Sequence, residues 1–185
     1  HGFETWYGVV DTGNIAFNIF AGNGGDGIFL KNGVSGINIF NNVIYGNGGH
    51  GIHLAVEKGE APFRIRIKNN IIMNNNGYEM KVAQGVVDLI SNYNCVYRAV
   101  SGPITEWYGA GYTWEDWKHH SQQDKNSINQ DPLFVNGAAG DFSLTVNSPC
   151  RNAGVDLGIE GMDYYGTPVS SGKVAIGVDL RQTAK

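Results

Sequence analysis

The stretch NVIYGNGGHGIHL, residues 42–54, repeats the stretch NIFAGNGGDGIFL, residues 18–30, at a spacing of 24 residues. Asparagine, glycine and aliphatic residues occupy the same positions in both copies. A third copy, NIIMNNNGYEMKV, follows at 70–82, and a weaker one begins at residue 94. Self-similarity with a period of roughly 20–50 residues is typical of a solenoid.

The residues inside each repeat predict strands and tight turns. Alternating apolar runs such as GIHL (51–54) and RIRIK (64–68) indicate short strands. Asn and Gly lie between them and accept left-handed turn conformations at little cost. Three strands and three turns in each repeat of about 24 residues predict an all-β, right-handed parallel β-helix of about four to six coils, whose equivalent residues stack about 4.8 Å apart.

The alignment of the repeats predicts which side chains stack inside the coil. One inward-facing column contains Phe3, Ile28, Ile52 and Met80, and a second contains Phe20, Ile44, Ile72 and Val96. We expect Asn42, Asn70 and Asn94 to form a ladder at one bend, where each amide bonds its neighbours above and below. An unpaired amide at such a buried position would cost about 1–3 kcal/mol.

The repeat ends near residue 98, so the coils are assigned to residues 1–98 of a single domain. Residues 99–128 form a loop and a short helix, in which Thr113 is the expected N-cap. The tryptophans of this helix are expected in the core or in a lid. Residues 129–185 contain turn signals between short strands and are expected to cap the end of the solenoid.

The composition excludes several classes of protein. The chain has 185 residues, 27 of them glycine, and a net charge of −4, which argues against a general nucleic-acid or membrane-surface binder. No apolar run approaches the roughly 18 residues of a membrane span. Cys95 and Cys150 lack metal-ligand spacing and are expected as two buried thiols or as one long-range bridge.

The segment DPLFVN…GDFSLTVNSPCRNAG…AIGVDL (131–180) and the coils of residues 14–97 resemble secreted bacterial right-handed β-helix proteins similar to pectate lyases. That group contains alginate- and chondroitin-lyase-like enzymes and some glycosidases. The resemblance implies a secreted or cell-surface protein that acts on polysaccharide.

The sequence departs from the pattern of this group in two places. AIGVDL stands where members often end in IGA followed by an aromatic and an acidic residue. The coils and capping helix that usually precede the repeat are missing. We therefore expect the carboxyl-terminal portion of a longer protein, or an open amino-terminal coil at which two copies associate end to end.

The resemblance also implies where a ligand would bind. In that group polysaccharide lies along the outer face of one sheet, here the sheet with the GIxL strands. Alternation sends a row of side chains outward on this sheet, with a turn residue beside it. The candidate catalytic residues are Lys81 and His53, and the candidate substrate-binding residues are Glu4, Phe29, His50, Glu79, Arg64 and Arg66.

Two reactions can be written for these residues. β-Elimination of a uronate needs a base, Lys81 or His53, and a cation that neutralises the carboxylate, Arg64 or Arg66. Hydrolysis needs two carboxyl groups roughly 5–10 Å apart, and Glu4 and Glu79, three coils apart, are too distant. Asp26 and Glu79 fit this distance better, although they lie in a turn and at a strand edge.

The sequence identifies no metal site. Calcium is the one cofactor considered, because Asp156, Glu160 and Asp163 carry carboxylates. They lack the spacing of a calcium loop and are better explained as turn residues. The leading hypothesis is lyase-type cleavage of a uronate-containing glycan. A non-catalytic carbohydrate-binding or structural module and a glycoside hydrolase stay open as alternatives.

Overall fold

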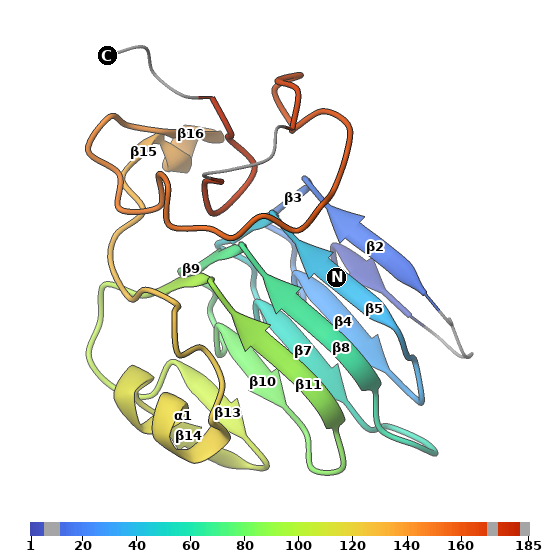
Figure 1. Ribbon diagram of the computed structural model, residues 1–185. Helices are drawn as coiled ribbons and strands as arrows, with labels where there is room; N and C mark the ends of the chain where they lie inside the picture. The colour runs from blue at the N-terminus through green and yellow to red at the C-terminus, as the bar shows by residue number, and fades with distance from the viewer. Residues whose placement is uncertain (6–11, 170–173, 182–185) are drawn as a thin grey trace.

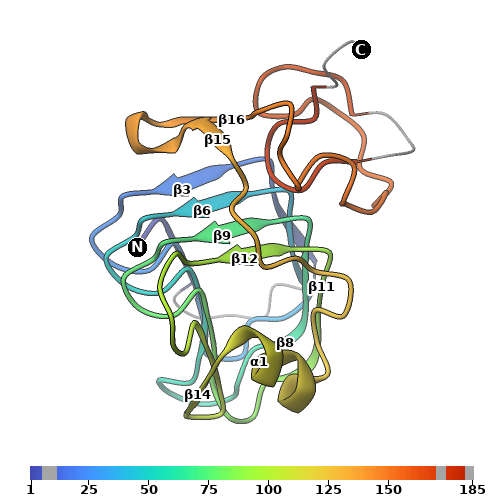
Figure 2. The same cartoon turned by 90° about the vertical axis from the view of Figure 1, so that its left-hand side faces the viewer.

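The chain winds into a right-handed solenoid of four coils (Figures 1 and 2). The computed structural model describes residues 1–5, 12–169 and 174–181. Each coil contributes one strand to each of three sheets, named sheets A, B and C. The fold predicted from the repeat is therefore confirmed.

The strands of each sheet follow the order of the coils. Sheet A contains β1 (Phe3–Glu4), β4 (Ile28–Lys31), β7 (Ile52–Ala55), β10 (Met80–Val82), β13 (Thr105–Trp107) and the antiparallel β14 (Ala110–Tyr112). Sheet B contains β2 (Gly13–Ala16), β5 (Ile37–Phe40), β8 (Phe63–Lys68) and β11 (Val87–Asn92). Sheet C contains β3 (Ile19–Ala21), β6 (Val43–Tyr45), β9 (Ile71–Met73) and β12 (Cys95–Tyr97).

Both predicted inward columns are confirmed by the strand register. The residues of each column are direct partners in sheets A and C. Outside the first coil, every member of the two columns is at most 1% exposed. Such stacking of aliphatic side chains along the bore supplies the apolar burial that stabilises the solenoid.

The predicted asparagine ladder is also confirmed. Asn42 Nδ2 donates to Asn70 Oδ1 at 3.0 Å, and Asn70 Nδ2 donates to Asn94 Oδ1 at 3.1 Å. Asn18 extends the ladder by one coil. The residue before each of these asparagines has a φ between 52° and 58°, in the left-handed region. The bend from sheet B to sheet C is therefore made by one left-handed residue in each coil.

The helix α1 (Trp114–Ser121) closes the carboxyl-terminal end of the bore (Figure 2). Its N-cap is Thr113, as predicted, whose hydroxyl accepts the N–H of Asp116. Trp117 is fully buried, packs edge-on against Trp107, and donates its indole N–H to Asp124 at 3.0 Å. The helix tryptophans are therefore core residues.

The described residues beyond 130 (131–169 and 174–181) lie in a different place from the expected one. They pack on the outer face of sheet C and do not cover the end of the coil (Figures 1 and 2). This segment contains β15 (Phe134–Asn136), the short 3₁₀ helix η1 (Gly137–Ala139) and β16 (Asp141–Leu144). The physical reason is that Val43, Ile71 and Cys95 point outward on sheet C, so its outer face is apolar and needs a cover.

Cys95 and Cys150 face each other at this packing surface. Both thiols are buried and unbridged. The hydrogen bond with Cys95, together with burial, raises the pKa of the Cys150 thiol well above its ordinary value. Of the two sequence alternatives, the structure therefore shows the pair of buried thiols.

The amino-terminal end of the solenoid consists of edge strands. β1, β2 and β3 are each the outermost strand of their sheet, and no described strand pairs with their outer edges. End-to-end association at this edge stays a prediction. In the described part of the chain, no helix is both long enough and apolar enough to cross a membrane.

Candidate active site on sheet A

The predicted outward row is confirmed as a row of register partners on sheet A. Glu4 pairs with Phe29, Phe29 with His53, and His53 with Lys81. Glu106 of β13 continues the row beside Lys81. Partners in neighbouring parallel strands lie about 4.8 Å apart, so these side chains form one continuous strip.

A histidine–carboxylate pair lies at the centre of this strip. His53 Nδ1 is 3.0 Å from Asp26 Oδ2, and the N–H of His50 donates to Asp26 Oδ1 at 2.6 Å. Burial favours the protonated form of Asp26, yet these two hydrogen bonds outweigh it and hold the pKa of Asp26 below its ordinary value. Because Asp26 is ionised, His53 Nδ1 carries the proton, and Nε2 presents a lone pair.

His50 lies beside this pair, but its side chain is hydrogen-bonded to the backbone of the neighbouring turn. Its ring is 4.8 Å from that of His53, and its Nδ1 accepts the N–H of Tyr78 at 2.8 Å. Burial, and then the neighbouring His53, lower the pKa of His50, so its ring is neutral. His1 and Asp26 accept the backbone N–H of the following coil in the same way. His50 is therefore the third member of a side-chain column that joins successive turns.

Asp26, His50 and His53 bring three potential metal-ligand atoms within 4.8 Å of one another. His50 cannot readily serve, since its Nδ1 accepts the N–H of Tyr78 and its Nε2 then carries the ring proton. A ligating histidine normally donates its second N–H to an acceptor, and here the second nitrogen faces a donor. Two remaining ligands are fewer than the three that a catalytic zinc site uses.

The residues considered for calcium do not come together. Asp163 accepts the backbone N–H groups of Tyr165, Thr167 and Leu180, and Asp156 accepts that of Gly158. Among the residues that the structure describes, these carboxylates and Glu160 form no ligand group. Asp156 and Asp163 act as turn residues.

Phe29 is enclosed by its neighbours in the row. Its ring packs against His1 and His53, each with a centroid distance of 4.8 Å, and only 6% of the residue is exposed. The ammonium of Lys31 lies over the same ring and binds Glu4 and Glu57, each at 2.8 Å. Phe29 and Glu4 are thus already engaged, and the ring offers a ligand little open surface.

Lys81 is the cation next to the histidine–carboxylate pair. Its Nζ lies 3.3 Å from Glu106, and 28% of its side chain is exposed. Glu106 was not predicted, because TEW (105–107) follows the break in the repeat and its register could not be read. Lys81 is therefore accessible to an anionic ligand on the strand next to His53.

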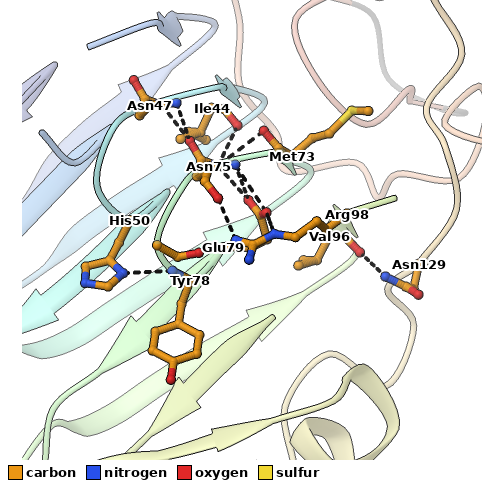
Figure 3. Close-up of polar contacts among 11 residues, drawn as sticks. Ile44, Asn47, His50, Met73, Asn75, Tyr78, Glu79, Val96, Arg98 and Asn129 are labelled. Atoms are coloured by element: carbon orange, nitrogen blue, oxygen red, sulfur yellow. Dashed lines mark hydrogen bonds and ion pairs between the residues drawn. The ribbon is translucent and has the colours of Figure 1, made fainter. Parts of the chain in front are cut away.

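Glu79 does not lie beside Lys81 on this face, and its carboxylate instead faces Asn75 and Arg98 (Figure 3). Its side chain is fully buried, and its carboxylate binds Asn75 at 2.6 Å and Arg98 at 2.9 Å. Burial raises the pKa of Glu79, although both partners oppose this shift. In this position its carboxylate is closed to a ligand.

Arg64 and Arg66 lie on β8 of sheet B, away from His53 and Lys81. Arg64 is exposed, with a left-handed φ of 53°, and its guanidinium lies over the ring of Phe63. Arg66 pairs with Asp88 at 2.8 Å. Neither can neutralise a carboxylate that is held against His53.

The charge of the strip bears on its ligand. Four carboxylates meet two ammonium groups along it: Asp26, Glu4, Glu57 and Glu106 against Lys31 and Lys81. Carboxylates therefore outnumber ammonium groups along the strip. Lys31 is held between Glu4 and Glu57, and Lys81 is the cation on the strand next to His53.

Comparison with known proteins gives the family. Residues 1–116 match the family model described as a right handed beta helix region. No curated protein and no solved structure matches the chain. The matched residues are more than half of the chain and include all four coils, so this protein belongs to the right-handed β-helix family.

Proposed function

We propose that the outer face of sheet A binds a uronate-containing polysaccharide and cleaves it by β-elimination. The observation that carries this proposal is the hydrogen bond of 3.0 Å between His53 and Asp26, with Lys81 on the next strand. The ionised Asp26 orients the His53 ring and stabilises its protonated form. A secreted or cell-surface location belongs to the same proposal.

The residues divide the reaction between them. His53 Nε2 removes the proton on the carbon next to the uronate carboxylate, and Lys81 binds that carboxylate as negative charge develops. The bond to the leaving oxygen breaks as the new carbon–carbon double bond forms. The leaving oxygen takes a proton from the medium or from protonated His53.

Elimination fits the face better than hydrolysis does. A glycosidase needs a carboxylic acid with a raised pKa as well as a second carboxylate. On this strip the pKa of Asp26 is lowered, and Glu106 and Glu4 are bound by lysines. Glu79 has a raised pKa but is buried away from the strip.

The test is turnover by His53→Ala, Asp26→Asn and Lys81→Ala on polygalacturonate, alginate and chondroitin, followed by the ultraviolet absorbance of the unsaturated product. We expect His53→Ala to lose about 100-fold or more. Asp26→Asn should lower turnover and displace its pH profile, which a purely structural role would not do. Lys118→Gln, on α1, is the matched control.

Three results would contradict this proposal. Unchanged turnover in His53→Ala would remove the assigned base. Sugar release without an unsaturated product would favour a hydrolase. Binding without turnover in the wild-type protein would favour the carbohydrate-binding alternative.

A further inference from the structure

We infer that the outer face of sheet B is a second binding surface for an anionic polysaccharide, with Phe40 and Lys68 at its centre. This inference takes only the class of ligand from the proposed function. Two outward columns run across the sheet in register. They consist of Asn14, Asn38, Arg66 and Ile90, and of Ala16, Phe40, Lys68 and Asn92.

The charge of sheet B is opposite to that of the strip on sheet A. Its strands carry three cations, Arg64, Arg66 and Lys68, and one carboxylate, Asp88. Asp88 pairs with Arg66, while Lys68 has no ion pair with any residue that the structure describes. On a protein with a net charge of −4, this local excess of positive charge favours an anionic chain.

The neighbours of Phe40 leave room for a sugar ring. Phe40 is half-buried, with the small Ala16 as its partner on one side and Lys68 on the other. Partners in adjacent strands lie about 4.8 Å apart, close to the length of one sugar residue. A uronate stacked on the Phe40 ring would place its carboxylate at the Lys68 ammonium and its hydroxyls at the Asn38 amide.

The other surfaces of the solenoid are covered by chain or carry paired charges. The segment beyond residue 130 covers sheet C, and α1 covers the end of the bore. The charges of the sheet A strip are paired with one another. Figure 1 looks onto β5, β8 and β11, and no segment is drawn across them. Sheet B therefore presents an uncovered face whose cation Lys68 is held by no ion pair among the described residues.

The experiment measures binding of oligosaccharides from polygalacturonate, alginate and chondroitin by calorimetry, with His53→Ala as the parent so that turnover does not interfere. Lys68→Gln should weaken binding about fivefold, with a smaller dependence on salt. Phe40→Leu, which keeps bulk but removes the ring, should weaken it about threefold to tenfold. Lys118→Gln, which removes the same charge elsewhere, should bind as the parent does.

The outcomes separate this inference from the proposed function. Equal binding by Lys68→Gln, Phe40→Leu and the parent would overturn it, as would a lack of binding to all three glycans. If Lys68→Gln weakens binding while the wild-type protein shows no turnover, the lyase proposal alone fails. In a protein with turnover, we expect Lys68→Gln to raise KM and leave kcat unchanged.

Discussion

Two amide ladders run along the bends of this solenoid, and they end in different ways. The ladder between sheets B and C ends at Asn94, whose N–H is accepted by the Ser127 hydroxyl at 2.7 Å. The ladder after sheet C, formed by Asn23, Asn47 and Asn75, ends at the carboxylate of Glu79. In both cases a residue from outside the asparagine column supplies the final acceptor.

The second ladder shows in detail how a missing coil is replaced. The carbonyl of Asn23 accepts the N–H of Gly48, and that of Asn47 accepts the N–H of Asn76. No N–H of a following coil donates to the carbonyl of Asn75 among the described residues. Arg98 Nη2 donates to this carbonyl instead, at 2.6 Å. Arg98 also donates to the Gly77 carbonyl, as the backbone N–H of a following coil would. The Glu79–Arg98 ion pair therefore replaces three groups of a following coil. The Glu79 carboxylate replaces an asparagine amide oxygen, and the Arg98 guanidinium replaces two backbone N–H donors.

The largest expected effect is that of Arg98→Ala. This change leaves the carboxylate of Glu79 buried without its cation and removes a donor from two carbonyls. Removing one partner of a buried ion pair costs about 3–5 kcal/mol of unfolding free energy. Urea unfolding, followed by circular dichroism, measures the loss.

A double variant separates charge from packing. Glu79→Gln with Arg98→Met leaves no charge buried at this bend, so it should cost less than Arg98→Ala alone. If Arg98→Ala unfolds within about 0.5 kcal/mol of the wild-type protein, the ion pair does not replace the missing coil.

A smaller effect is expected inside the other ladder, from Asn70→Ala. Asn70 Oδ1 accepts the backbone N–H and the Nδ2 of Asn42, and both donors are buried. Their loss of a partner costs about 1–3 kcal/mol. Asn18→Ala, at the exposed start of the ladder, is the matched control and should cost less than about 1 kcal/mol. Equal losses at the two positions would show that ladder bonds do not depend on burial.

The solenoid could be predicted because one repeat fixes both the core and the bends. Each inward aliphatic residue recurs at the same position, so the register follows from the spacing. The cover of sheet C could not be predicted in the same way. VIY (43–45), IIM (71–73) and CVY (95–97) are apolar on both faces, which is a sign of a covered sheet, but nothing in the repeat says which segment covers it.

The row on sheet A could be predicted from alternation, whereas the His53–Asp26 pair could not. Asp26 lies in the turn before β4, and only the side-chain geometry shows that it reaches His53 on the next strand. Arg64 and Arg66 were predicted to neutralise a carboxylate held beside Lys81 or His53, although a β-helix moves to another sheet within a few residues. Proximity along the chain is a poor guide to proximity in a solenoid.

The position of Glu79 carried a signal in the sequence. Glu79 stands in the column of Gly27 and Gly51, where a Cβ would lie within 2.9 Å of the next asparagine of the ladder. At the following coil the asparagine position is Ala99. Without that asparagine the glycine is no longer required, and the Glu79 side chain fills the space. A glycine lost together with an asparagine thus marks the end of a ladder.

The smallest expected effect is on the pH dependence of stability, and it tests the charged end of the ladder. Burial raises the pKa of Glu79 above its ordinary value of 4.5, so folding favours the protonated carboxyl. This contribution to stability is fully present below pH 4.5 and is lost as the pH rises through the raised pKa. Glu79→Gln does not titrate, so this variant cannot lose the contribution. Its unfolding free energy should therefore rise relative to that of the wild-type protein as the pH rises from 4.5 through the raised pKa of Glu79. Urea unfolding of both proteins across that interval measures the difference. A constant difference would mean that Glu79 titrates in the folded protein as it does in the unfolded chain, because Asn75 and Arg98 fully offset the burial of its carboxylate.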